Sequence, residues 1–433
     1  PQSTVLFSRE GLLLGARVAA DGQWRFPPSQ APLPQRNLQA LLLFEDRHFM
    51  HHPGVDPLAL ARAVWQNLTR GRRVSGASTL SMQVIRLARG PRARTLGEKF
   101  REILLALRLE RRLTKQEVLR LYATHAPFGG NIVGLEAASW LLFHRAPQHL
   151  TWAESALLAV LPNAPSSLHI GRMRQPLLAK RNRLIQRLFR KGLMDQATCR
   201  MAQAEPLPPP NGSLPDLAPH LLDSLARQSS QTRLTSTLQI DLQRRLTDKM
   251  KSWSPILAGQ GVPHAAALIV HNPSGEVLAQ VGNTASRQGG ASASWVDLSW
   301  APRSSGSLLK PFLYGALLEQ GQITPLSLMA DVPIRIGAYS PENFDRLYQG
   351  ALRADLALAR SRNIPAVREL QMFGVAPFLA LLRSWGVSTL SRNAEDYGLS
   401  LILGGGETCL VEMAGLYTLL AQKASTQTVL LPI

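Results

Sequence analysis

Glu45 is the first residue of this sequence whose type and position suggest chemistry. The apolar residues of the segment 38–42 recur at helical spacing, and the same stripe continues onto Glu45 and then Phe49. A carboxylate at such a position is partly desolvated, which favours its neutral form and raises its pKa toward the range useful for proton transfer. A rim glutamate paired with Arg47 or a nearby histidine fits the same periodicity, so the pattern leaves both interpretations open.

A second carboxylate, Glu102, lies in a strongly basic stretch. Lys99 and Glu102 are three residues apart and would share one face of a helix. The stretch from Arg70 to Arg112 contains twelve basic and three acidic residues. Clustered arginines suit phosphate oxygens. The plainer interpretation is a solvated ladder of ion pairs, each worth about 0.2–0.5 kcal/mol.

Ser78 and Thr79 follow the small residues Gly76 and Ala77 and precede an apolar helical pattern. We expect Ser78 to cap this helix. Free backbone N–H groups and hydroxyls at the start of a helix form a site for phosphate oxygens. An ordinary N-cap without a ligand fits the same residues.

Ser307 and Lys310 form a second chemical pattern. They are three residues apart on one expected helix face, so that the amine can take the proton of the hydroxyl. Ser361 and Asn363 supply a Ser-x-Asn triplet further along the chain. The four-letter Ser-x-x-Lys pattern is common by chance and gains weight from this second triplet.

The composition points to a partner that carries dense negative charge. Among 433 residues, 48 Lys and Arg against 29 Asp and Glu give a net charge of +19. Nucleic acid, an anionic membrane or a phosphate-bearing substrate would all explain that excess. The basic stretch lacks interleaved aromatic residues and any nucleic-acid-binding signature, which argues against nucleic acid. The two cysteines, Cys199 and Cys409, support neither a zinc site nor a disulfide framework.

The elements that must position these residues suggest a multidomain chain, α followed by mixed α and β. We expect short strands at Thr4 to Phe7 and Leu12 to Val18, then a helix that Asn37 caps and that ends at Pro53-Gly54. The predicted regions are N-terminal strands and spacer (1–36), a mostly α-helical domain (37–203), a proline-rich linker region (204–260) and a mixed α/β region (261–433). A helix from Leu234 to Trp253 is expected within the linker region.

The string EDRHFMHHPG at residues 45–54 resembles the first motif of the peptidoglycan glycosyltransferases, glycosyltransferase family 51, written E-D-x-x-F-x-x-H-x-G. GASTLSMQ at residues 76–83 resembles the second motif, and Lys99 with Glu102 resembles the third. Ser307-x-x-Lys310 and Ser361-x-Asn363 resemble the motifs of penicillin-binding transpeptidases. Together they resemble the class A penicillin-binding proteins over nearly the whole chain.

This resemblance implies a lysozyme-like glycosyltransferase domain followed by a penicillin-binding transpeptidase domain. The catalytic residues that it implies are Glu45, Glu102, Ser307, Lys310, Ser361 and Asn363. The implied substrate-binding residues are Asp46, Phe49, His52, Ser78, Thr79, Gln83, Arg86 and Lys99. A divalent cation, Mg²⁺ or Mn²⁺, is implied as well, with Asp46 as its candidate ligand.

Several positions depart from the family pattern. Ser81 replaces a threonine of the second motif, Glu98 replaces the arginine of the third, and Ala123-Thr124 replaces Leu-Asn of the fourth. The Lys-Thr-Gly element of transpeptidases does not occur after Asn363. We therefore expect the second domain to be incomplete or inactive in the given chain.

The implied activity is polymerisation of lipid II into β-1,4 glycan strands with inversion, at the periplasmic face of a bacterial inner membrane. Lipid II, the growing glycan, an anionic membrane surface and cell-wall synthesis proteins are the expected partners. No apolar run reaches the length of a membrane span. The family's single N-terminal anchor is therefore expected ahead of Pro1, outside this chain. A non-catalytic scaffold or penicillin-binding module that recruits wall-synthesis partners is the alternative.

Overall fold

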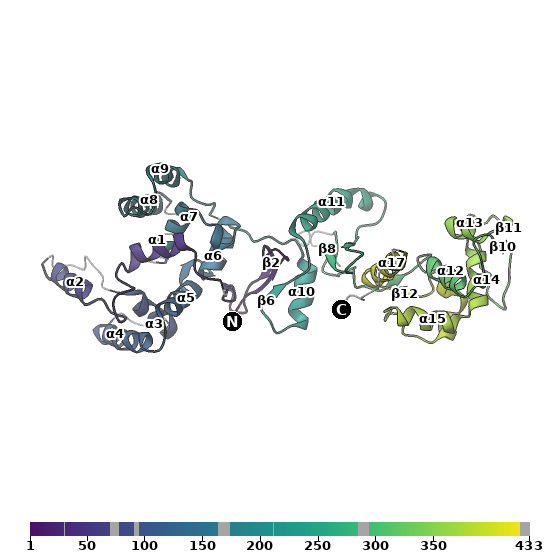
Figure 1. Ribbon diagram of the computed structural model, residues 1–433, viewed down its shortest axis with the longest axis horizontal. Helices are drawn as coiled ribbons and strands as arrows, with labels where there is room; N and C mark the ends of the chain where they lie inside the picture. Colours follow the sequence, from purple (N-terminus) through teal and green to yellow (C-terminus); the bar gives the residue numbers. More distant parts are fainter. Residues whose placement is uncertain are drawn as a thin grey trace. The chain divides into compact units, whose positions relative to one another are not determined.

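The computed structural model describes residues 1–29, 31–69, 78–90, 95–162, 174–210, 212–284 and 294–424. The chain divides into two compact units (Figure 1). The first contains Pro1–Leu217 and Leu222–Ser236, and the second contains Ala218–Leu221 and Thr237–Ile433. The N-terminal strands thus fold together with the helical region that follows them.

A small sheet begins the first unit. β1 (Thr4–Phe7) pairs antiparallel with β2 (Leu13–Arg17), which confirms the two predicted strands. β6 (Arg233–Thr235) joins β1 in parallel, so residues far along the chain complete this sheet. Because residues 233–235 are extended, the following helix begins later than predicted, as α11 (Ile240–Gly259).

In the described part of the first unit, most of the helices between residues 35 and 204 contribute to one apolar core, with a three-stranded sheet at its edge. Within the described residues, α1 packs against α7 and α8, and α3 packs against α4 and α5. The helices are α1 (Gln35–Glu45), α2 (Pro57–Thr69), α3 (Leu80–Arg89), α4 (Leu96–Glu110), α5 (Lys115–His125), α6 (Leu135–Phe143), α7 (Trp152–Val160), α8 (Arg174–Arg190) and α9 (Gln196–Ala204). The sheet contains β3 (Trp24–Arg25), β4 (Pro127–Gly129) and β5 (Ile132–Val133).

The predicted bounds of the first helix are wrong at both ends. Pro34 occupies the N-cap position, and Asn37 is buried inside the first turn. The helix ends at Glu45 because Asp46 adopts an extended backbone, with φ −157°. Phe49 still reaches the core, fully buried, but from the turn that follows the helix.

Threonines cap four helices of the first unit. The predicted cap at Ser78 is wrong, because Thr79 caps α3 by accepting a hydrogen bond from the N–H of Met82. Thr95 caps α4, while Thr114 and Thr151 form capping boxes at α5 and α7. Such caps satisfy backbone donors that a helix start leaves unpaired. The starts of α3 and α4, which carry most of the candidate site, are therefore locally defined.

The second unit is mixed α and β, as predicted. β7 (Ala267–Val270) and β8 (Val277–Val281) form an antiparallel hairpin, and α11 packs against β8. Two further two-stranded sheets pair β10 (Leu328–Asp331) with β11 (Gly350–Arg353) and β9 (Arg303–Ser304) with β12 (Glu407–Thr408). Its other helices are α12 (Lys310–Glu319), α13 (Ala354–Ala359), α14 (Asn363–Phe373), α15 (Val375–Ser384), α16 (Ala394–Tyr397) and α17 (Leu410–Ala424), while α10 (Pro219–Gln228) has residues in both units.

Among the described residues no single helix combines the length and apolar composition of a membrane span. α14 and α15 meet those criteria only as a pair that bends by 89° between them.

Candidate active site

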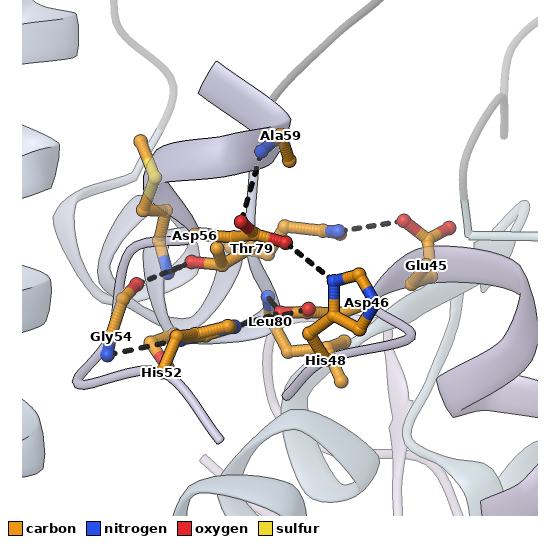
Figure 2. Close-up of polar contacts among 12 residues, drawn as sticks. Glu45, Asp46, His48, His52, Gly54, Asp56, Ala59, Thr79 and Leu80 are labelled. Atoms are coloured by element: carbon orange, nitrogen blue, oxygen red, sulfur yellow. Dashed lines mark hydrogen bonds and ion pairs between the residues drawn. The ribbon is translucent and has the colours of Figure 1, made fainter. Parts of the chain in front are cut away.

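Glu45 is the last residue of α1 and is half-buried. Gln83, the fourth residue of α3, donates a hydrogen bond from Nε2 to Glu45 Oε2 at 2.7 Å (Figure 2). An amide donor orients the carboxylate without neutralising its charge. The structure therefore holds Glu45 in a defined orientation at the end of α1.

Asp46 is buried, and its carboxylate is engaged with the protein. It accepts a hydrogen bond from the N–H of Leu80 at 3.1 Å, and both its oxygens lie 3.0 Å from His52 Nε2 (Figure 2). The N–H of Gly54 donates to His52 Nδ1 at 3.1 Å. Because Nδ1 accepts, the neutral ring carries its proton on Nε2 and donates it to Asp46. Asp46 and His52 thus tie the turn after α1 to the start of α3.

Gly54 makes a second tie between the same segments. Its carbonyl accepts a hydrogen bond from Thr79 Oγ1 at 2.6 Å. Its φ is +107°, and a Cβ at this position would lie 2.7 Å from the carbonyl oxygen of Ala106 in α4. A glycine is required here both by the backbone conformation and by the close approach of α4. Thr79 and Gly54 therefore fix the relative positions of α3, α4 and the turn.

Phe49 packs against the turn that follows α1 and belongs to the apolar core. It is fully buried and contacts the His52 ring edge-on, with 6.0 Å between centroids. Lys115, the first residue of α5, places Nζ 4.3 Å from the Phe49 ring centre and donates to the His52 carbonyl at 2.6 Å. Phe49, predicted as a substrate-binding residue, therefore packs in the core in this structure.

Glu102, on α4, forms a two-pronged ion pair with Arg86 of α3. Arg86 Nε and Nη2 donate to the two Glu102 oxygens, each at 2.8 Å. Burial raises the pKa of Glu102, but the hydrogen bonds and charge of Arg86 outweigh this effect and hold the pKa below its ordinary value. The same hydrogen bonds raise the pKa of Arg86. Both groups are consequently charged at neutral pH.

Two further predicted residues gather beside this pair. Lys99 Nζ donates to Ser78 Oγ at 2.6 Å and lies 3.8 Å from Glu102 Oε2. Arg86 Nη2 approaches the same serine oxygen at 3.4 Å. Two cations thus lie within hydrogen-bonding distance of one hydroxyl just before the start of α3, an arrangement suited to phosphate oxygens.

Gln83 and Arg86 are three residues apart and share one face of α3, so they place their two carboxylate partners along that face. Glu45 also contributes to the raised pKa of Arg86, which shows that its charge is within electrostatic reach. We call Glu45, Gln83, Arg86 and Glu102 the α3 row. It joins a half-buried carboxylate to a cation-rich cluster on one helix face.

The departures from the family motifs have local structural explanations. Glu98 forms ion pairs with Arg89 and Arg101, both at 2.9 Å, so it joins the ion-pair ladder along α3 and α4. Ser81 donates to Glu110, which in turn pairs with Lys115. The basic residues at positions 70, 72, 73, 92 and 94 of the stretch from Arg70 to Arg112 lie outside the described residues.

Sequence reasoning missed cations that α8 brings toward Glu45. Burial lowers the pKa of Lys180 and the Glu45 carboxylate opposes that shift, which places the two charges within electrostatic reach. Lys180 Nζ also lies 5.0 Å from the Phe44 ring centre. Arg187 donates to the Leu43 carbonyl at 2.5 Å. The basic run of α8 was a visible signal, but nothing local linked it to a residue about 140 positions earlier.

A metal ion held by several protein side chains does not fit the residues that the structure describes. No group of three or more His, Cys, Asp and Glu side chains there is placed to hold one. Asp46 accepts two hydrogen bonds from buried donors, Glu45 accepts from Gln83, and Glu102 pairs with Arg86. Divalent cations such as Mg²⁺ prefer several oxygen ligands. In each of these carboxylates at least one oxygen is already bound to a protein donor.

In the second unit, Lys310 is buried at the start of α12 and meets two of its predicted partners. Its Nζ donates to the Ser361 carbonyl at 2.8 Å, to Ser361 Oγ at 3.2 Å and to Asn363 Oδ1 at 2.8 Å. Burial lowers the pKa of Lys310 to about 8. Glu369 of α14 is buried nearby, and burial raises its pKa to about 7 against the opposing charge of Lys310.

Ser307 is exposed in the turn before α12, so the predicted helix start is three residues too early. Within the described residues no hydrogen bond joins its hydroxyl to Lys310, whose three donors serve Ser361 and Asn363. The structure thus assembles Lys310, Ser361 and Asn363, while Ser307 is linked to Lys310 through its carbonyl, which accepts from the Lys310 backbone N–H at 3.2 Å, and not through its hydroxyl.

A buried network holds the Ser361–Asn363 triplet in place. Arg362 is buried and donates from Nε to Asp331 at 3.0 Å. Asn343 donates to the same aspartate at 2.7 Å and accepts from the N–H of Asn363 at 2.9 Å. Ser361 adopts a left-handed φ of 52°, a strained conformation for a non-glycine residue. Sequence reasoning missed the contribution of Asp331 and Asn343 because both lie about 20 to 30 positions upstream.

Comparison with known proteins agrees with this arrangement. Residues 14–189 match the Transglycosylase family model, and residues 265–400 match the Penicillin binding protein transpeptidase domain model. Penicillin-binding protein 1C of Escherichia coli K12 is 40% identical over 422 residues, which cover 96% of this chain and 54% of that protein. Penicillin-binding protein 1F of Bacillus subtilis 168 is 28% identical over 403 residues, covering 88% of this chain and 54% of the relative.

Penicillin-binding protein 1B of Escherichia coli K12 is 29% identical over 441 residues, covering 93% of this chain and 50% of the relative. The chain thus spans about half the length of the curated relatives it matches. The Transglycosylase match precedes the transpeptidase-domain match along the chain. The chain belongs to the class A penicillin-binding proteins. The resemblance predicted from the motifs is confirmed.

Proposed function

We propose that the first unit is a peptidoglycan glycosyltransferase that polymerises lipid II into β-1,4 glycan strands. The α3 row carries the proposal, because it joins a half-buried carboxylate to a cluster of hydroxyl and cationic groups on one helix face. Transfer of a sugar from a pyrophosphate donor needs a base at one end and positive charge at the other. A glycan hydrolase would need a proton-donating carboxyl instead, and the pKa of Glu102 is shifted the wrong way for that role.

In the proposed reaction Glu45 takes the proton of the acceptor sugar's 4-hydroxyl. The resulting oxygen attacks the anomeric carbon of the growing chain, and the bond to the pyrophosphate breaks with its electron pair on the phosphate oxygen. Attack opposite the leaving group converts an α-linked phosphate into a β-1,4 linkage. Gln83 holds Glu45 through its amide hydrogen bond.

Arg86, Lys99 and Ser78 stabilise the departing pyrophosphate in this proposal. Glu102 is ionised and bound to both nitrogen donors of Arg86, so its role is to hold the two cations in position rather than to donate a proton. Positioned charge that needs no rearrangement during the reaction contributes strongly to catalysis. Thr79, Asp46 and His52 act indirectly, by fixing the start of α3.

A divalent cation, expected from the resemblance, would act by neutralising pyrophosphate oxygens. Because the described residues provide no protein cage for it, we propose that the substrate supplies most of its ligands and water the remainder. The proton transfer to Glu45 and the attack on the anomeric carbon do not require the metal as a reactant. Polymerisation rates measured over a range of Mg²⁺ concentrations, with lipid II mixed with Mg²⁺ either before or after the protein is added, test this proposal.

We propose that the first unit works at an anionic membrane surface on the periplasmic side of the inner membrane. α2 exposes Leu58 and Trp65, whose exposed fractions are 76% and 71%, and α4 exposes Phe100 at 62%. Exposed apolar side chains of this size beside basic residues are typical of surfaces that contact lipid headgroups. Lipid II would present its pyrophosphate at such a surface. We also propose cell-wall synthesis proteins as partners of this chain.

For the second unit we propose a penicillin-binding domain with little or no remaining activity, in which Lys310, Ser361 and Asn363 lie around Ser307. Within the described residues Lys310 Nζ donates to Ser361 and Asn363 and not to the Ser307 hydroxyl, which also fits a second candidate, a non-catalytic module that docks wall-synthesis partners. Labelling with a fluorescent penicillin tests both candidates, with Ser307→Ala as the control. We expect weak or no labelling: weak labelling that is lost in Ser307→Ala supports a residual penicillin site, no labelling supports the docking module, and strong serine-dependent labelling would contradict both.

Incubation of the chain with lipid II, a divalent cation and detergent tests the glycosyltransferase proposal. The expected product is a polymer that runs as a ladder on a gel and is degraded by a muramidase. A scaffold without activity would leave lipid II unchanged. Absence of polymer at every detergent and cation concentration tried, with a folded protein, would overturn the proposal.

A further inference from the structure

A cavity of about 280 Å³ lies in the first unit, on the opposite end of α5 from the Lys115 contact to the first motif. Its wall is contributed by the proline-rich segment after β3, the last turn of α5, the start of α6 and the turn after α6. The volume equals that of roughly nine water molecules in the liquid, too large for one structural water and close to the lower bound of ligand pockets, about 300 Å³.

Proline and aromatic side chains form the apolar part of the cavity wall, which also contains polar residues. Phe7, Phe26 and Leu135 line it together with five prolines, at positions 27, 28, 32, 34 and 147. Proline fixes its own φ, so a wall rich in proline is largely preformed and loses little freedom when a ligand binds. Such a wall suits a compact apolar group.

The polar groups at the cavity are unequal in charge. Glu136 and Arg233 form a two-pronged ion pair with distances of 2.9 and 3.1 Å, and Arg233 also stacks 4.4 Å from the Phe7 ring centre. This pair neutralises itself. Arg120 also lines the cavity, and its guanidinium makes no hydrogen bond or ion pair within the described residues. The charge of Arg120 contributes to the lowered pKa of Glu117, one turn earlier in α5. The Glu117 carboxylate itself takes part in the capping box of α5. One positive charge therefore remains for a ligand.

Trp140 also lines the cavity, and the residue is 4% exposed. Its indole nitrogen has no hydrogen-bond partner in the part of the chain that the structure describes, but this atom is itself buried. Trp140 therefore adds apolar ring surface to the wall rather than a donor for a ligand. The cavity thus combines a partly apolar wall with an available cation.

We propose that this cavity binds a small amphipathic carboxylate whose apolar body fills the proline- and aromatic-lined wall and whose carboxylate pairs with Arg120. The free acid of a small molecule and the C terminus of a polypeptide ending in an apolar residue share this chemistry. The site is distinct from the α3 row and does not depend on the proposed glycosyltransferase activity.

Ligand-observed NMR titration of the full chain with 4-phenylbutyrate tests the proposal. A ligand of this size should bind with a Kd on the order of 1 mM. The neutral isostere 4-phenylbutyramide should bind about fivefold more weakly, because the charge pair with an exposed arginine is modest. Equal binding of the acid and the amide would overturn the assignment of an anion site.

Three variants locate the binding. Arg120→Gln should weaken the acid about fivefold and leave the amide unchanged, whereas Arg200→Gln, an exposed arginine of α9 outside the cavity, should change neither. Ala123→Leu adds volume inside the cavity and should abolish binding of both probes. Persistence of the preference for acid in Arg120→Gln, or unaltered binding in Ala123→Leu, would each overturn the proposal.

A further pair of probes identifies the source of the carboxylate. Acetyl-Gly-Phe with a free C terminus is compared with the same peptide amidated and with 4-phenylbutyrate. Tighter binding of the free-terminus peptide than of 4-phenylbutyrate assigns a polypeptide end, and the reverse order assigns a free acid. Binding of neither acid, with the protein folded, would overturn the site.

Discussion

Replacing Asp46 with asparagine should lower the free energy of unfolding of the first unit, because the carboxylate serves two buried donors. Leu80 N–H lies 3.1 Å and His52 Nε2 3.0 Å from its oxygens. An asparagine retains one acceptor and turns an NH₂ toward the other donor, so that one buried donor loses its partner at a cost of about 1–3 kcal/mol. Asp46→Ala strands both donors and should cost about 2–6 kcal/mol.

Urea unfolding of the full chain, with the transition of the first unit followed separately from that of the second, measures these losses. Asp195→Asn is the matched control, because Asp195 caps α9 through a 2.7 Å bond from Thr198 N–H. Asparagine and aspartate cap equally well, so that the control should stay within about 0.5 kcal/mol. If Asp46→Asn is as stable as Asp195→Asn but loses dependence on Mg²⁺, Asp46 is a metal ligand and the reasoning is refuted.

Three further predictions follow from single contacts. Gly54→Ala should destabilise the first unit by about 2–5 kcal/mol, since its Cβ would stand 2.7 Å from the Ala106 oxygen, whereas Gly97→Ala on α4, whose Cβ would have 4.0 Å to its nearest neighbour, should be neutral or stabilising in the same unfolding assay. Arg86→Lys should slow glycan polymerisation about tenfold to a hundredfold with little change in melting temperature, because it keeps the charge and loses the two-pronged contact with Glu102; an unchanged rate would remove Arg86 from the mechanism. Glu369→Gln should stabilise the second unit increasingly as pH rises from about 5 to 7, because the wild-type carboxyl, with its pKa raised to about 7, binds its proton more tightly folded than unfolded; a difference between the two proteins that does not vary with pH would contradict this assignment.

The sign of that last effect follows from which state holds the proton. Between the ordinary glutamate pKa of 4.5 and the folded value of about 7, the folded chain binds more protons, so rising pH lowers stability through that window. Lys310 behaves in the opposite sense at higher pH. Its pKa is lowered from 10.5 to about 8, so the unfolded chain binds more protons there and stability rises through that interval. The two windows are separate enough to measure individually.

The position of Glu45 was predictable because helical periodicity is local. The stripe led to the last residue of α1, where the structure places it. The end of that helix was not predictable, because the group that draws Asp46 out of helical geometry is the N–H of Leu80, 34 positions away. Likewise, two adjacent hydroxyl residues compete for the α3 cap. The choice of Thr79 depends on Gly54 from the preceding turn and on Lys99 of α4, which engages Ser78.

The second unit shows the same division. The spacing of the sequence identified four candidate residues, Ser307, Lys310, Ser361 and Asn363. The contacts of Lys310 with Ser361 and Asn363 show that these three lie together. The sequence did not predict the strained backbone at Ser361. It also did not predict the network of Asp331, Asn343 and Arg362 that holds this segment, because its members are distant in the sequence. Local patterns identify candidate groups, and long-range hydrogen bonds determine their orientation.

The initial rate of lipid II polymerisation by Glu45→Gln tests the proposed mechanism most directly. Glutamine keeps the shape of the side chain and its proximity to Gln83 but cannot take a proton, so the rate should fall by about 10²–10⁴ while circular dichroism and melting temperature stay at the wild-type values. A variant that keeps more than about a tenth of the wild-type rate would show that the proton leaves by another route and that Glu45 is not the base.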